Sequence, residues 1–201
     1  MKTIELFEHD RALLQKGYLL LAGMDEAGRG PLAGPVTAGI CVMNLTDYID
    51  GINDSKKLSE KKRTELYKRI VENALGFSVI DVDNRTIDSV NILNATKRAM
   101  QECVRSLLPF PDLLLIDAVK EDFGVPSVSI IHGDAISYSI AAASILAKVH
   151  RDELMAKYDE TYPEYGFAKH KGYGTKEHIE ALKKYGPCPI HRQTFIKNFF
   201  A

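Results

Sequence analysis

Short apolar runs alternate with longer amphipathic stretches along this chain of 201 residues. The runs at 18–22 and 36–43 have the length of buried strands, and 77–82 alternates between apolar and polar positions. Two further runs, 112–117 and 128–134, are apolar and end in a carboxylate. Continuous apolar runs of this length are typical of strands that are covered on both faces. The pattern therefore predicts five strands.

Helical periodicity fills the intervals between these runs. It predicts helices over residues 4–16, 60–75, 84–108, 135–158 and 175–185. Ser59 stands in an N-cap position, Gly76 and Gly186 follow predicted helix ends, and Pro109 stops the longest helix. The resulting order of elements predicts an α/β fold with a mixed five-stranded sheet flanked by helices.

The composition changes near residue 160, where the chain becomes rich in aromatic, glycine and basic residues. This change predicts a main domain over 1–160 and a C-terminal helical segment over 161–201. The length and the apolar content of 45% fit such an arrangement. No run approaches the roughly 20 apolar residues of a membrane span, and the start carries no signal-peptide core.

Three widely spaced cysteines follow no metal-ligand pattern, which fits buried thiols in a reducing cytoplasm. A monomer is the default expectation. The formal net charge is −1, so overall charge does not predict a nucleic-acid partner. Binding to a nucleic acid would have to come from local basic patches.

The stretch 23–35 joins the first two predicted strands and holds two adjacent acids, one arginine and four glycines. Glycine gathers where the backbone needs positive φ or where another group approaches closely. A hairpin with a solvated acidic turn is one interpretation of this stretch. A cation site beside the open end of a strand is the other, since carboxylates there need a partner.

Acids at the ends of other predicted strands favour the second interpretation. Asp25 and Glu26, Asp117 and Asp134 each lie at or just beyond the carboxyl end of a strand or on the following helix start. That edge of an α/β sheet is where ligands bind. Any one of these acids alone is usually a cap or turn residue. Together, as oxygen-only ligands, they predict a two-metal Mg²⁺ or Mn²⁺ site of the kind that cleaves phosphodiesters. Adjacent strand residues face opposite ways, so Asp25 and Glu26 share a metal only if the strand ends or bulges there.

A family resemblance covers residues 18–195. Eight motifs occur in colinear order: MDEAGRGPLAGP at 24–35, DSKKL at 54–58, LID at 115–117, GD at 133–134, SIAAASILAKV at 139–149, RD at 151–152, HKGYGT at 170–175 and YGPCPIHR at 185–192. In these motifs the chain resembles bacterial ribonuclease HII, the type 2 ribonuclease H. The resemblance implies a ribonuclease H-like sheet and a C-terminal segment that completes the substrate groove. It implies endonucleolytic cleavage of RNA in RNA–DNA hybrids and of single ribonucleotides in duplex DNA, leaving 3′-hydroxyl and 5′-phosphate ends.

The resemblance also implies roles for individual residues. Asp25, Glu26, Asp117 and Asp134 match the family's four metal-binding acids. Gly28, Arg29 and Gly30 match its loop that reads the ribose 2′-hydroxyl, and Tyr173 matches the tyrosine that packs on the neighbouring deoxyribose. Glycine backbone can approach a 2′-hydroxyl closely, and aromatic stacking tolerates any base. For Tyr173 alone, a buried anchor of the C-terminal segment is the alternative.

Basic residues near these motifs are candidates for phosphate contacts. Lys56, Lys148 and Lys171 are the main ones, although a solvated helix face is the simpler interpretation of the cluster around Lys56. Further candidates are Lys169, His170, Lys183, Lys184 and Arg192. His132 and Ile136 stand where many relatives carry a cation, which predicts one or two fewer backbone contacts. His132 is also a candidate proton carrier, with a locally paired histidine as the alternative.

The segment 193–200 has a Gln-x-x-aliphatic-x-x-aromatic-aromatic spacing, which resembles the peptide that docks onto sliding clamps. The alternative is a terminal apolar tail that packs on its own domain. For the whole chain, two other functions compete with ribonuclease HII. One is a ribonuclease H-fold nuclease that acts on DNA, and the other is a non-catalytic nucleic-acid or clamp-binding module. The loop at 28–30 with Tyr173 argues against the first, and retention of all four acids argues against the second.

Overall fold

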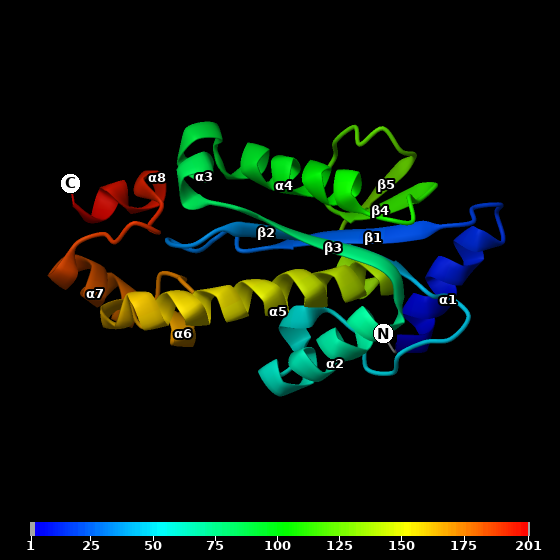
Figure 1. Cartoon of the computed structure of the whole chain (residues 1–201), viewed down its shortest axis with the longest axis horizontal. Coiled ribbons are helices and arrows are strands. Elements are labelled where there is room, and N and C mark those ends of the chain that lie inside the picture. The colour runs from blue at the N-terminus through cyan, green and yellow to red at the C-terminus, as the bar shows by residue number, and fades with distance from the viewer. Residues whose placement is uncertain (1–2, 201) are drawn as a thin grey trace.

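The computed structural model describes residues 3–200, and a five-stranded sheet lies between two helical layers (Figure 1). The strand order is β3-β2-β1-β4-β5. The strands are β1 (Leu21–Ala27), β2 (Val36–Met43), β3 (Ala74–Val82), β4 (Leu113–Asp117) and β5 (Ser127–Ile130). The pairs β1–β2 and β2–β3 are antiparallel, whereas β1–β4 and β4–β5 are parallel. The predicted mixed sheet of five strands is therefore confirmed.

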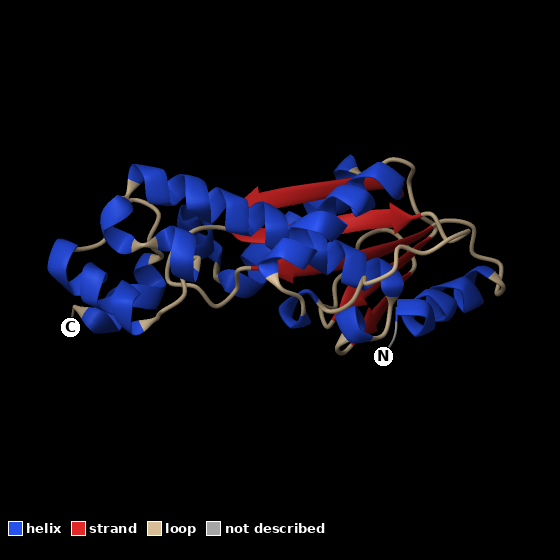
Figure 2. Cartoon of the chain, turned by 90° about the horizontal axis from the view of Figure 1, so that it is seen from below, coloured by secondary structure: helices blue, strands red, loops and turns tan. Residues whose placement is uncertain are grey.

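The helices form one layer on each face of the sheet and a group at one end (Figures 1 and 2). Helices α3 (Asn84–Val90) and α4 (Ile92–Ser106) cover one face, and α2 (Glu60–Asn73) and α5 (Tyr138–Thr161) lie on the other. Helix α1 (Thr3–Leu14) lies at the end remote from the C-terminal group. That group comprises α6 (Phe167–His170), α7 (Lys176–Tyr185) and α8 (Gln193–Ile196).

Strand β1 lies further along the chain than the apolar run at 18–22 predicts. The backbone N–H groups of Leu19 and Leu20 donate to the carboxylate of Asp112 at 2.7 and 3.0 Å, so these two residues precede the ladder. Antiparallel pairing with β2 then continues as far as Ala27. Asp25 and Glu26 consequently lie inside the strand, not beyond its end, which corrects the prediction.

Two glycines let α5 lie directly on the central strands. A Cβ atom at Gly23 would be 2.0 Å from the carbonyl carbon of Ser139, and one at Gly39 would be 2.7 Å from the carbonyl oxygen of Ala143. Side chains at these positions would push the helix away from the sheet. Because Gly23 and Asp25 point to the same face, this approach brings the start of α5 beside Asp25.

Two helix boundaries differ from those predicted. The helix predicted over 84–108 is two helices, because Asn91 has φ 67° and its side chain accepts from the N–H of Asn94, which starts α4. Helix α2 begins after the predicted N-cap Ser59 but ends at Asn73, so Gly76 belongs to β3. A Cβ atom at Gly76 would collide with the carbonyl oxygen of Leu108. This glycine therefore permits a backbone approach and does not cap a helix.

The fifth strand is shorter than predicted. It ends at Ile130, and His132, at φ 57°, turns the chain into a 3₁₀ turn over Gly133–Ala135. Helix α5 starts later than predicted, with the side chain of Ser137 accepting from the N–H of Ile140. Asp134 therefore lies on a buried turn between β5 and α5.

The C-terminal helices pack in a small apolar core together with Met155 of α5 and Ala33. Helix α7 is capped by Thr175 and followed by Gly186 at φ 75°, as predicted. Tyr165, Phe167 and Met155 belong to this core, which is distinct from the clusters on the two faces of the sheet. Among the described residues, no helix combines the length and apolarity that crossing a membrane requires. The three cysteines are free and buried, as predicted.

Candidate active site

Three aspartates from separate parts of the chain meet at one edge of the sheet. Asp25 comes from β1, Asp117 ends β4, and Asp134 lies on the turn before α5. One carboxylate oxygen of each lies within 4.8 Å of one from each of the others. Asp25 and Asp134 are buried. A group of oxygen ligands this close fits a hard divalent cation.

Backbone groups hold two of these carboxylates in place. The N–H of Glu26 donates to Asp25 Oδ1 at 2.7 Å, and the N–H of Gly133 donates to Asp117 Oδ1 at 2.8 Å. A Cβ atom at Gly133 would lie 3.5 Å from Asp117 Oδ1, so the turn passes close to that side chain. The turn therefore brings Asp134 to the aspartates of β1 and β4.

The aspartates disfavour one another's charge. Burial raises the pKa of Asp25 well above its ordinary value, and the charges of Glu26, Asp117 and Asp134 raise it further. Burial also raises the pKa of Asp134, with Asp54 and Asp117 adding to the shift. A bound divalent cation would reverse this penalty, because its charge favours the ionised forms. This set of carboxylate oxygens therefore fits Mg²⁺ or Mn²⁺.

Lys56 supplies the cationic group nearest to Asp134. Its Nζ lies 3.8 Å from Asp134 Oδ2, and its side chain is 77% exposed. Burial lowers the pKa of Lys56, but the negative charges of Asp134, Asp25 and Asp54 outweigh that effect and raise it overall. Because its ammonium group is exposed and close to the acids, Lys56 can also reach a bound anion.

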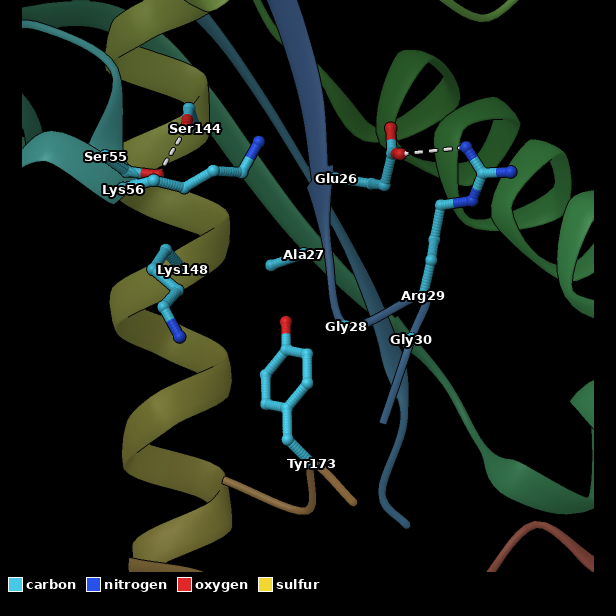
Figure 3. A pocket seen from close by; sticks show the side chains of 10 residues that line it. All are labelled: Glu26, Ala27, Gly28, Arg29, Gly30, Ser55, Lys56, Ser144, Lys148 and Tyr173. Atoms are coloured by element: carbon cyan, nitrogen blue, oxygen red, sulfur yellow. Dashed lines mark hydrogen bonds and ion pairs between the residues drawn. The ribbon is translucent and has the colours of Figure 1, made fainter. Parts of the chain in front are cut away.

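Glu26 lies apart from the three aspartates. Its Oε1 accepts from Arg29 Nη1 at 3.3 Å (Figure 3), while Oε2 is buried and has no hydrogen-bond donor among the described residues. Burial raises the pKa of Glu26, and the positive charge of Arg29 opposes that shift. Of the four acids predicted to hold metal, the three aspartates lie together, whereas Glu26 pairs with Arg29.

The cleft beside the aspartates contains most of the predicted substrate-contacting residues (Figure 3). It has a volume of about 610 Å³ including its open mouth. Its lining is formed by Glu26, Ala27, Gly28, Arg29, Gly30, Ser55, Lys56, Ser144, Lys148 and Tyr173. The Tyr173 side chain is exposed, at 44%, as its glycine-rich setting predicts. A Cβ atom at Gly30 would lie 3.7 Å from Tyr173 Cε1, so the loop and the ring lie close together.

Two buried arginines hold the loop over 28–35. Arg192 is fully buried and donates to the carbonyl oxygens of Gly28, Arg29, Gly34 and Pro35 at 2.6–3.0 Å. Arg151 donates to the carbonyl oxygens of Ala33, Pro35 and Lys171 at 3.0–3.2 Å.

The burial of these groups corrects part of the predicted phosphate-binding set. Arg192 cannot contact phosphates, because its guanidinium group is enclosed by backbone. His170 is 8% exposed and bonds within the C-terminal helices. Lys171 lines a neighbouring pocket, 3.9 Å from Glu60, and donates to the carbonyl of Ala168. Lys148 lies in the cleft but is paired with Asp152 at 2.7 Å.

Two features of the site were missed at the level of the sequence. Asp54 raises the pKa of Asp134 by its charge and caps the 3₁₀ turn that carries Lys56. The hydroxyl of Ser144 on α5 donates to that of Ser55 at 2.6 Å and fixes the same turn. The motif at 54–58 was the available signal, but its spacing does not show which helix it packs against.

Comparison with known proteins gives a consistent result. Residues 22–200 match the family model described as Ribonuclease HII. Ribonuclease HII of Acetivibrio thermocellus is 54% identical over 199 residues, covering 98% of this chain and 78% of the relative. Ribonuclease HII of Caldicellulosiruptor saccharolyticus is 51% identical, covering 96% of this chain and 94% of the relative.

Solved structures share the fold. The ribonuclease H2 of Pyrococcus horikoshii superposes with a TM-score of 0.75 at 26% identity, covering 90% of this chain and 99% of that one. The ribonuclease HII of Archaeoglobus fulgidus, solved in complex with PCNA, gives 0.74 at 24% identity, covering 90% and 97%.

Proposed function

This chain belongs to the ribonuclease HII family, and from that premise we propose that it nicks duplex DNA on the 5′ side of single embedded ribonucleotides. Family membership makes it a metal-dependent endoribonuclease of the ribonuclease H type, with RNA–DNA hybrids as its substrate class. One observation carries the finer proposal. The three aspartates adjoin a cleft in which the loop at 28–30 faces Tyr173.

We propose that Asp25, Asp117 and Asp134 hold one catalytic metal ion and that Glu26, which cannot share that ion with Asp25 on a regular strand, supplies a carboxylate to the second ion. The buried Glu26 Oε2 without a donor, and the raised pKa values of Asp25 and Asp134, support this assignment. Two bound Mg²⁺ or Mn²⁺ ions would activate the attacking water and stabilise the departing 3′-oxygen. Lys56, 3.8 Å from Asp134, and Lys148 line the side of the cleft where a phosphate would lie.

The remaining cleft residues are assigned to reading the sugar. The backbone of Gly28, Arg29 and Gly30 would bond the ribose 2′-hydroxyl, because glycine allows the sugar to approach closely. Tyr173 would pack on the next deoxyribose. The loop carbonyls held by Arg192 and Arg151 keep this backbone in one conformation. An enzyme built this way recognises the kind of sugar and not the base.

A DNA duplex that carries one ribonucleotide tests the proposal. With Mg²⁺ or Mn²⁺, we expect a single nick 5′ to the ribonucleotide, leaving 3′-hydroxyl and 5′-phosphate ends, and loss of cutting in Asp25→Asn and Asp134→Asn. Cutting of the matched all-DNA duplex would instead favour a DNA nuclease of the same fold. Binding of the ribonucleotide duplex without cutting would favour a non-catalytic module.

We also propose that 1–160 forms the catalytic domain and 161–201 a C-terminal segment that completes the cleft through Tyr173. Helix α5 ends at Thr161, and the helices after it pack in a separate apolar cluster that Ala33 and Met155 of the first domain also join. The segment 193–200 is proposed to dock onto a sliding clamp, which its spacing supports. Ile196 is 1% exposed, so docking requires this turn to detach. Unchanged clamp binding after deletion of 193–201 would refute the docking proposal.

A further inference from the structure

Three histidines are buried together between α6, α7 and the segment before α8. His178 and His191 are fully buried, and His170 is 8% exposed. The rings of His170 and His178 stack with centroids 4.5 Å apart. Nε2 of His178 lies 3.0 Å from Nε2 of His191. None of the three lines the cleft, but His178 contacts the backbone of Tyr173, which does line it.

The partners of these rings determine which nitrogen carries the proton. His178 Nδ1 lies 2.9 Å from the carbonyl oxygen of Tyr173, which can only accept, so Nδ1 carries the hydrogen. His191 Nδ1 lies 2.9 Å from the backbone N of Cys188, which can only donate, and 3.3 Å from its carbonyl oxygen, which can only accept. The shorter contact is the bond from the N–H, so Nδ1 is bare. In the neutral rings, His191 Nε2–H then donates to His178 Nε2. The chain runs in one direction, from Cys188 through both histidines to Tyr173.

His170 supports the same turn from its other side. Its Nδ1 accepts from the N–H of Gly172 at 3.2 Å, and its Nε2–H donates to the carbonyl oxygen of Tyr165 at 2.7 Å. A Cβ atom at Gly172 would lie 2.6 Å from the carbonyl oxygen of Ala33, so the turn has no room to shift toward the loop. Donors and close contacts therefore surround the backbone on which Tyr173 is mounted.

We infer that His178 is a positioning residue for Tyr173, acting through the hydrogen bond from its Nδ1–H to the Tyr173 carbonyl, with His191 fixing the tautomer that makes this bond. The inference rests on the sugar-reading role proposed for Tyr173. Tyr173 must keep its ring facing Gly30 while the ring itself remains exposed. The orientation of the ring is consequently set by the contacts that fix the Tyr173 backbone.

A double-mutant cycle tests this positioning, with nicking of the single-ribonucleotide duplex as the measurement. His178→Phe keeps the ring contacts with His170 and Phe167 but removes the donor, and we expect nicking to slow about tenfold. In a Tyr173→Ala background the same change should slow nicking by less than about twofold, because the ring that His178 positions is absent. His178→Asn, whose amide N–H can replace Nδ1–H, should restore most of the rate.

The controls separate this inference from the proposed function. Glu180→Gln, on the exposed side of α7, should leave the rate unchanged. Equal slowing by His178→Phe in both backgrounds would overturn the positioning role, as would failure of His178→Asn to restore the rate. A wild-type rate in Tyr173→Ala would overturn the role proposed for Tyr173 and, with it, any role of His178 through that residue.

Imidazole nitrogen NMR of the unliganded chain gives a readout that is independent of activity. We expect the Nδ1–H form for His178 and the Nε2–H form for His191 at neutral pH. An Nε2–H or doubly protonated His178 would overturn the inference, because neither is compatible with the hydrogen-bond chain. Thermal unfolding of each variant shows whether a slower rate reflects loss of folded protein.

Discussion

Asp25 and Glu26 are consecutive residues of β1, and their carboxylates point to opposite faces of the sheet. Asp25 joins Asp117 and Asp134, whereas Glu26 pairs with Arg29 at 3.3 Å. The regular pairing of β1 with β2 through Ala27 imposes this alternation, so no bulge turns the second acid toward the first. The carboxylates of Asp25 and Glu26 thus lie on opposite sides of β1, and Arg29 forms an ion pair with Glu26.

Removal of one buried acid should stabilise the metal-free protein while it abolishes cleavage. Burial and neighbouring charges raise the pKa of Asp25, so its ionised form destabilises the folded state at neutral pH. We expect Asp25→Asn to raise the unfolding temperature in EDTA by about 2–8 °C, equivalent to about 1–2 kcal/mol. Mg²⁺ should stabilise the wild type more than the variant. The exposed Asp50→Asn is the matched control and should change neither value.

The conformation of the loop at 28–35 can be tested at two glycines with positive φ. Gly28 has φ +88°, and a Cβ atom there would be 2.0 Å from Arg151 Nε. We expect Gly28→Ala to cost about 2–4 kcal/mol of stability, measured by urea unfolding. Gly124 has φ +70° but no atom within 4 Å, so Gly124→Ala should cost only about 1–2 kcal/mol. Equal losses at the two positions would show that Arg151 does not constrain the loop.

Arg192 should resist replacement even by lysine. It bonds four carbonyl oxygens with one guanidinium group, and burial lowers its pKa to about 9. A lysine ammonium cannot reproduce this planar set of donors. We expect Arg192→Lys to cost about 3 kcal/mol or more and to raise KM for the ribonucleotide duplex. The exposed Arg105→Lys, on α4, is the control; if both changes had similar effects, the loop would not depend on Arg192.

Acid should unfold the chain partly through His191. Burial and the neighbouring His178 lower the pKa of His191 from its ordinary value of 6.5 to about 4. The unfolded chain therefore binds a proton that the folded chain excludes, and stability falls as the pH drops from about 6.5 to about 4. The titratable groups that face the ring are His178, His170, Cys188 and Tyr165.

The expected loss from this one group is about 3 kcal/mol across that pH interval. His191→Gln should remove most of it, because glutamine can donate to His178 Nε2 without binding a proton. The measurement is the difference between wild-type and variant unfolding free energies at pH 7 and pH 4, which cancels the carboxylates common to both. A constant difference between the two proteins would contradict the assignment.

Much of the fold was predictable because apolar runs report burial directly. The five strands, the caps at Ser59 and Thr175 and the exposure of Tyr173 all follow from local pattern. Boundaries failed where a distant group decided them. The carboxylate of Asp112 accepts from the N–H groups just before β1, so the strand starts later than predicted. The backbone of Leu108 leaves no room for a side chain at position 76, so Gly76 lies in β3 and does not end a helix.

The site followed the same division. Strand ends predicted that Asp25, Glu26, Asp117 and Asp134 would converge, and the three aspartates do, because strand direction carries that information. The sequence could not show that Arg192 faces backbone and not phosphate, since a buried and an exposed arginine have the same local pattern. Nor could it show the proton positions in the histidine chain, which depend on carbonyl and amide groups of other segments.

The three buried cysteines can report which helical layer of the protein separates from the rest. Cys41 packs with α5 on one face of the sheet, Cys103 of α4 packs against the other face, and Cys188 packs with the C-terminal helices. A thiol reagent can reach each one only when the surrounding layer separates. If the C-terminal segment opens by itself, Cys188 is modified first and the other two together and later. The order in which the thiols react thus gives the order in which the helical layers separate, and no substitution is needed to measure it.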